Sequence, residues 1–124
     1  MARYLSHDQH YMEAQQGWKK LEQTKKKFFT SNFVLDETFT LLARRAGYAF
    51  SSLRARAIFT SQILTILRPS YEEELAALDC FEKYADQQVS FTDCVSFVLM
   101  RKIGIQEAFS FDKHFERAGF KMWQ

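Results

Sequence analysis

The last forty residues constrain the fold more strongly than any other part of the chain. Ser90–Asp93 starts with a helix-capping residue, and the residues after it are apolar on nearly every side up to Gly104. A helix that is apolar all round is buried between other elements. Beyond it, the pattern predicts a strand over Ala108–Phe111, a short helix over Asp112–Ala118 and a last strand over Phe120–Trp123. Strand, helix and strand in so few residues form a parallel crossover unit, which predicts an α/β fold.

The earlier part of the chain alternates in the same way between helical and strand patterns. The predicted elements are a helix from about His10 to Thr24, a buried strand over Lys27–Ser31, a helix from Phe33 to Gly47, a helix capped by Ser51 or Ser52, a strand over Ile63–Leu67 and a helix from Ser70 to about Asp86. Ser70 and Glu73 have the spacing of a capping box.

Length and composition indicate one well-packed domain over residues 1–124. Hydrophobic residues make up 47% of the 124 residues, and 13 of them are Phe. The net charge of +2 is compatible with nucleic acid without arguing for it, and the clusters of Lys and Arg are typical of solvated helix faces. The N-terminus has no apolar segment of the secretory type and no window suits a membrane span, so a soluble, cytoplasmic protein is expected.

Several site types are disfavoured by the sequence. Cys80 and Cys94 lie far apart with no CxxC pattern, which predicts two buried thiols in a reduced protein and no zinc site. The three His have no zinc spacing and no nucleophile paired with them. A Gly-rich phosphate loop is absent from the sequence, which disfavours an NTPase or a dinucleotide enzyme.

Three carboxylates fall where an open parallel sheet binds ligands. Glu37 lies in the second turn of the helix after the strand Lys27–Ser31, Asp93 opens the buried helix, and Asp112 follows the strand Ala108–Phe111. Ligands bind outside the carboxyl ends of such strands. Clustered carboxylates repel one another and raise each other's pKa, a conflict that a hard cation such as Mg²⁺ or Mn²⁺ removes. The set favours phosphoryl chemistry over acyl transfer.

Each of these acids also has a purely structural interpretation. Asp93 stands three residues after Ser90 and could complete a capping box, Asp112 could be an N-cap, and Glu37 could be a solvated helix residue. Their joint placement favours the functional interpretation, and an unrelated small α/β domain whose acids are caps stays open.

Two stretches carry a resemblance to a known family. The residues Val89–Met100 followed by Ala108–Phe115 resemble the C-terminal half of PIN-domain proteins, and Phe33–Leu42 resembles the helix that bears the family's second acid. Asp8 and His10 are similar to an Asp and a His that follow the family's first helix. The resemblance implies a three-layer domain with a short parallel sheet flanked by helices. It also implies a metal-dependent endoribonuclease of the kind found as the toxin of bacterial toxin–antitoxin pairs.

The resemblance assigns roles to particular residues. Glu37, Asp93 and Asp112 would be three of four acids that bind Mg²⁺ or Mn²⁺, with Asp93 a direct ligand. Ser31 and Ser110 would hydrogen-bond the acids. Lys113, His114 and Arg44 would meet the RNA backbone. The implied partners are the RNA substrate, an antitoxin protein and a second copy in a homodimer.

One departure from the family is expected to matter. PIN domains begin with a central strand that ends in a metal-binding Asp, whereas Arg3–Leu5 corresponds to the far part of the following helix, so the first strand is expected to be missing. Three explanations are open: a natural start upstream of the given one, which we favour, a fold that closes without the strand, or a second chain that fills the gap. Asp8 is a weak substitute for the absent ligand. Without the first Asp, the alternative function is a catalytically silent module that binds RNA or a protein.

Overall fold

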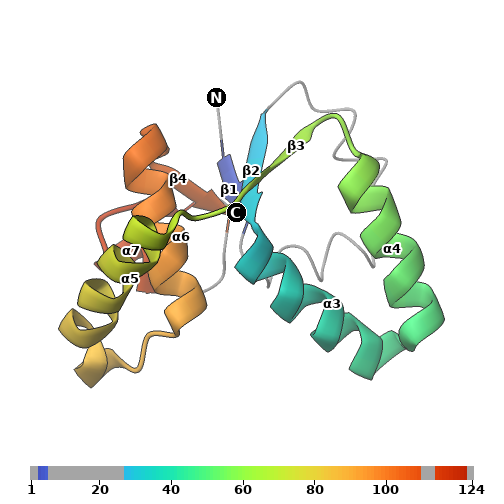
Figure 1. The fold of residues 1–124 in the computed structure, drawn as a ribbon, viewed down its shortest axis with the longest axis horizontal. Helices are drawn as coiled ribbons and strands as arrows, with labels where there is room; N and C mark the ends of the chain where they lie inside the picture. Colours follow the sequence, from blue (N-terminus) through green and yellow to red (C-terminus); the bar gives the residue numbers. More distant parts are fainter. Residues whose placement is uncertain (1–2, 6–26, 110–113, 123–124) are drawn as a thin grey trace.

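The computed structural model describes residues 3–5, 27–109 and 114–122. Its elements in chain order are β1 (Arg3–Leu5), β2 (Phe28–Ser31), α3 (Asn32–Ala46), α4 (Tyr48–Thr60), β3 (Leu64–Leu67), α5 (Tyr71–Lys83), the 3₁₀ helix η1 (Ala85–Gln87), α6 (Phe91–Ile103), β4 (Glu107–Phe109), α7 (His114–Arg117) and β5 (Lys121–Met122) (Figure 1). The helix predicted over His10–Thr24 lies outside the described residues. Within the described part, no helix is both long and apolar enough to cross a membrane.

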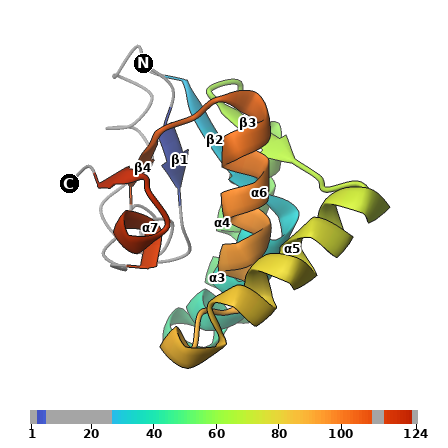
Figure 2. The same ribbon diagram turned by 90° about the vertical axis from the view of Figure 1, so that its left-hand side faces the viewer.

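The strands form one parallel sheet. Its order is β3-β2-β1-β4-β5, and all four neighbouring pairs run parallel. In Figure 1, α3 and α4 lie on one side of the strands and α5, α6 and α7 on the other, and Figure 2 turns the second group toward the viewer. The predicted α/β fold with a short parallel sheet flanked by helices is therefore confirmed.

The centre of the sheet differs from the prediction. Arg3–Leu5 is β1, the central strand, with Tyr4 opposite Phe29 on one side and Ala108 on the other. The prediction that this segment belongs to a helix and that the described chain lacks a first strand is wrong. An empty position between β2 and β4 would leave buried backbone N–H and C=O groups without partners. A three-residue strand is too short for its side-chain pattern to reveal it.

The core has two parts. One cluster surrounds α6 and includes Tyr4, Phe97, Phe115 and Phe120, with Phe29 packed against it. The other joins α3, α4, β2 and the edge strand β3 through Phe28, Leu35, Ile58 and Leu64. Because successive side chains of a strand point to opposite faces, Phe28 and Phe29 of β2 serve different clusters. As predicted, α6 is buried on nearly all sides.

The turn between α3 and α4 is tighter than predicted. Gly47, with a φ of 94°, ends α3, and α4 begins at the next residue, so the start predicted at Ser51 or Ser52 is wrong. Ser51 is instead a helix-interior residue whose hydroxyl donates to the Phe39 carbonyl oxygen at 2.8 Å. Glycine adopts a positive φ without strain, so the chain can reverse its direction at this single residue. The result is a compact helical hairpin.

Glu73 belongs to the predicted capping box of α5 and also contacts α6. The Ser70 hydroxyl accepts from the Glu73 N–H, and the Glu73 carboxylate accepts from the Ser70 N–H at 2.7 Å. The same carboxylate lies 2.9 Å from Lys102 Nζ near the end of α6. The helix ends at Lys83, three residues before the predicted Asp86, and η1 follows. This partly exposed ion pair is one of the contacts between α5 and the helix that carries Asp93.

Replacing Glu73 by Gln tests this link. The hydrogen bond from the Ser70 backbone, followed by that from Lys102, holds the pKa of Glu73 below its usual value of 4.5. The stabilisation is therefore present above that value and is lost as the pH falls through the lowered folded-state pKa. We expect Glu73→Gln to cost at most about 0.5–1 kcal/mol in urea unfolding at pH 7, because solvent screens this partly exposed contact, and progressively less as the pH falls through the folded-state pKa of Glu73. Glu72→Gln, at an exposed position in the same turn, is the control, and an equal loss in both variants would contradict the assignment.

Candidate functional site

The carboxyl edge of the sheet collects two helix N-termini. Ser31 ends β2 and caps α3, its hydroxyl accepting from the Val34 N–H at 3.1 Å. Ser90 caps α6, and its hydroxyl accepts from the Asp93 N–H at 3.1 Å. Helix N-termini favour negative charge nearby because their N–H groups are unpaired and the helix dipole is positive there. This edge is thus built to hold carboxylates or other anions.

Asp93 is a buried carboxyl group in the first turn of α6. It is 3% exposed, although Asp is rarely found fully buried without a partner. The negative charge of Asp93 helps to raise the pKa of two neighbouring groups, the Tyr4 hydroxyl and the Cys94 thiol. The prediction that Asp93 lies at the start of a buried helix is confirmed, and its backbone N–H donates to the Ser90 hydroxyl that caps this helix.

Cys94 follows Asp93 and is fully buried. Burial raises the pKa of its thiol to about 12, and a hydrogen bond with Cys80, the Cys80 charge and the Asp93 charge act in the same direction. Both cysteines are free and buried, as predicted. A thiol that stays protonated at neutral pH is not a nucleophile, so Cys94 belongs to the packing of α5 against α6.

Glu37 lies on α3 at a more open position. It is half-buried and lines a hollow of about 340 Å³ together with Asp36, Thr40, Leu41 and Arg44. The structure therefore places two of the predicted site residues, Glu37 and Arg44, on one surface. Arg44 is exposed in the last turn of the helix.

The remaining predicted site residues lie wholly or partly outside the part of the chain that the structure describes. Asp112, Ser110 and Lys113 are not among the described residues, and of His114 the backbone in α7 is described but the side chain is not. Over residues 3–5, 27–109 and 114–122, no group of three His, Cys, Asp or Glu side chains converges to hold a metal ion. The predicted trio stays a prediction, because its third member lies outside these ranges.

Tyr4 is a residue at this site that sequence reasoning did not select. Its side chain is 0% exposed, and its hydroxyl lies 2.6 Å from Ser96 Oγ of α6. Burial raises the pKa of Tyr4 well above its ordinary value of 10.0, hydrogen bonds with Ser31 and Ser96 lower it in part, and the charge of Asp93 raises it again. No signal in the sequence links Tyr4 to this edge, because the link depends on the position of β1.

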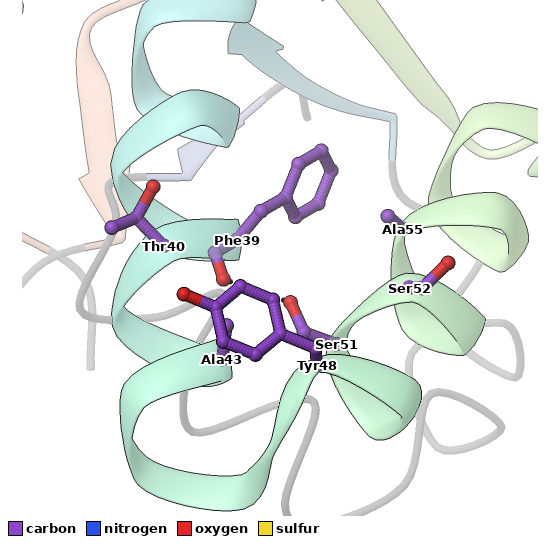
Figure 3. Close-up of a pocket in the computed structure, with 7 residues that line it drawn as sticks. All are labelled: Phe39, Thr40, Ala43, Tyr48, Ser51, Ser52 and Ala55. Atoms are coloured by element: carbon purple, nitrogen blue, oxygen red, sulfur yellow. Dashed lines mark hydrogen bonds between the residues drawn. The ribbon is translucent and has the colours of Figure 1, made fainter.

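A second hollow lies inside the helical hairpin. Its volume is about 280 Å³, and it is lined from α3 by Phe39, Thr40 and Ala43 and from α4 by Tyr48, Ser51, Ser52 and Ala55 (Figure 3). The residues that line it include no carboxylate, His or Cys. This hollow therefore lacks the groups that the predicted chemistry needs, and the candidate site remains the carboxyl edge of the sheet.

Comparison with known proteins identifies the family. The model of the PIN domain matches residues 2–121. The chain belongs to the PIN-domain family. Among curated PIN proteins, the 23S rRNA-specific endonuclease VapC20 of Mycobacterium tuberculosis is 41% identical over 91 residues, which are 73% of this chain and 69% of that protein. A VapC ribonuclease of Aquifex aeolicus is 29% identical over 122 residues, 95% of this chain and 86% of the relative.

Solved structures of PIN proteins agree with this assignment. The crystal structure of M. tuberculosis VapC20, a Sarcin-Ricin loop cleaving toxin, matches with a TM-score of 0.84 at 30% identity over 95% of both chains. The VapBC2 structure from Rickettsia felis matches with a TM-score of 0.72 over 99% of this chain and 98% of that one. Its 11% identity supports the fold alone.

Replacing Ser31 by Ala tests the construction of this edge. The variant loses the cap on α3 and the hydroxyl that contacts Tyr4, and both losses occur at a fully buried position. We expect the free energy of unfolding in urea, followed by circular dichroism, to fall by about 1–2 kcal/mol.

The control for Ser31→Ala is Ser52→Ala, an exposed serine in α4. That change should stay within about 0.5 kcal/mol of the unsubstituted protein. A Ser31→Ala variant as stable as Ser52→Ala would contradict the proposed role of the Ser31 hydroxyl.

Proposed function

We propose that this PIN-domain protein is a toxin-type endoribonuclease that hydrolyses RNA phosphodiester bonds with the help of Mg²⁺ or Mn²⁺. The observation that carries the proposal is the 41% identity to an endonuclease specific for 23S rRNA. The buried carboxylate of Asp93 at the carboxyl edge of the sheet supports it, because that edge is where ligands of parallel sheets bind.

Glu37, Asp93 and Asp112 are proposed to hold the cation. The donor set fits a hard cation, because its proposed members are all carboxylates, and carboxylate oxygens are the ligands that such a cation prefers. When bound, such a cation polarises the phosphodiester and lowers the pKa of an attacking water. The helix N-terminus and the Ser90 cap fix the backbone of Asp93. Ser110 is proposed to orient Asp112.

The α3–α4 hairpin is proposed to meet the RNA backbone. From Thr38 to Ser70 the chain contains five Arg and no Asp or Glu. Arg44 and Arg45 end α3, and Arg44 lines the same hollow as Glu37. Arg contacts to phosphate supply affinity that is independent of sequence and weakens with salt. Lys113 and His114 are proposed to extend this contact after β4.

An antitoxin partner and a homodimer are also proposed. The curated relatives are VapC proteins, and the R. felis structure is a VapBC complex, so an antitoxin of the VapB type is the expected partner in the cytoplasm. Tyr48, Leu53 and Phe59 are large apolar side chains exposed on α4, which suits a protein interface.

The alternative function is a silent PIN module that binds RNA or a protein without cleaving. The observation that favours it is the sequence of β1, which is Arg-Tyr-Leu and carries no acid. A site with three acids would bind the cation less tightly than a site with four, since the charge that attracts it is smaller.

Cleavage of a structured ribosomal RNA fragment decides between these functions. We expect cleavage with Mn²⁺, none with EDTA, and a loss of about 100-fold or more in kcat for Asp93→Asn, which removes the ligand charge and keeps the side-chain shape. Asp79→Asn, an exposed acid on α5, is the matched control and should cleave like the unsubstituted protein.

Two results would contradict the proposed nuclease activity or its proposed site. A folded sample that binds the RNA but leaves it intact at millimolar Mn²⁺ would support the silent module. Cleavage that Asp93→Asn and Asp79→Asn retain equally would place the chemistry elsewhere.

A further inference from the structure

The hydroxyl of Tyr4 connects three elements at the carboxyl edge. It stands on the central strand β1, contacts Ser96 Oγ of α6 at 2.6 Å and hydrogen-bonds Ser31, which caps α3. Each of these three side chains is 0% exposed. A buried polar group is stable only with hydrogen-bond partners, so the three hydroxyls depend on one another.

The direction of these hydrogen bonds follows from the number of hydrogens. The Ser96 hydroxyl donates its single hydrogen to the Thr92 carbonyl oxygen at 3.1 Å, so it accepts from Tyr4. The Ser31 hydroxyl accepts from the Val34 N–H and therefore has its own hydrogen left for the Tyr4 oxygen. The result is a directed chain from Ser31 through Tyr4 and Ser96 to Thr92.

The chain of hydroxyls ends in the turn that carries Asp93. Thr92 and Asp93 are the second and third residues of α6, and Ser96 lies one turn further on. The Asp93 carboxylate is also near enough to the Tyr4 oxygen to act on it electrostatically. Because burial keeps the phenol protonated at neutral pH, it stays a donor to Ser96.

We propose that Tyr4 is a positioning residue, whose hydroxyl fixes the first turn of α6 and with it the orientation of Asp93 relative to α3. The expected effect of the Tyr4 hydroxyl on cleavage rests on the proposed function, whereas its expected effect on the first turn of α6 rests on geometry alone. Groups that orient a metal-binding side chain without touching the metal commonly change metal affinity or activity by about 10- to 100-fold when removed.

The test compares Tyr4→Phe with Tyr84→Phe. Both changes remove one hydroxyl from a buried ring of the same core cluster, and Tyr84 packs on Phe97 with ring centroids 6.0 Å apart. For Tyr4→Phe we expect Mn²⁺ affinity and kcat to fall about 10- to 100-fold with little change in KM. We also expect faster amide hydrogen exchange at Cys94–Ser96 in the metal-free protein. Tyr84→Phe should leave all four quantities near those of the unsubstituted protein.

A double-mutant cycle keeps the test decisive if Tyr4→Phe is less stable than expected. Ser96→Ala removes the acceptor from the other side, and the double variant should lose no more Mn²⁺ affinity than the worse single variant. Additive losses, or hydrogen exchange at Cys94–Ser96 equal in Tyr4→Phe and Tyr84→Phe, would overturn the proposal. If the unsubstituted protein neither binds Mn²⁺ nor cleaves RNA, the proposed function fails, and the exchange comparison still decides the role of Tyr4.

Discussion

The burial of one carboxylate, that of Asp93, is the constraint on which the functional edge depends. A buried charge is costly unless hydrogen bonds, a helix dipole or a cation compensates it. In this protein the N-terminus of α6, where the Ser90 hydroxyl accepts from the Asp93 N–H, supplies part of the compensation. A divalent cation bound to Asp93, as proposed above, would add to this compensation.

The sheet explains why these groups meet. All strands are parallel, and their order is β3-β2-β1-β4-β5. After β1 the chain adds β2 and β3 on one side of it, and then crosses to add β4 and β5 on the other side. Crevices at such a reversal are where open α/β sheets bind ligands. The helix α3 starts directly after β2, and α6 runs into β4 through a short turn at Gly104. The topology therefore brings both helix N-termini to one edge without long loops.

Much of this could be predicted from the sequence, and the errors have physical causes. Apolar periodicity gave α3 and α6, and the capping residues Ser31, Ser70 and Ser90 marked helix starts, because these signals are local. The start of α4 was missed because a glycine turn, and not a serine cap, sets it. The strand β1 was missed because three residues form a strand only through their neighbours. Tyr4 was missed for the same reason, since its partners lie far away in the sequence.

The most direct test of the account is the position of a bound cation. Crystals soaked in millimolar Mn²⁺ and measured at the manganese absorption edge locate the ion by anomalous scattering. We expect a peak within about 2.0–2.6 Å of an Asp93 carboxylate oxygen, with Glu37 and Asp112 beside it. A peak elsewhere, or none while the protein remains folded, would contradict the claim that this edge of the sheet is a metal-binding site.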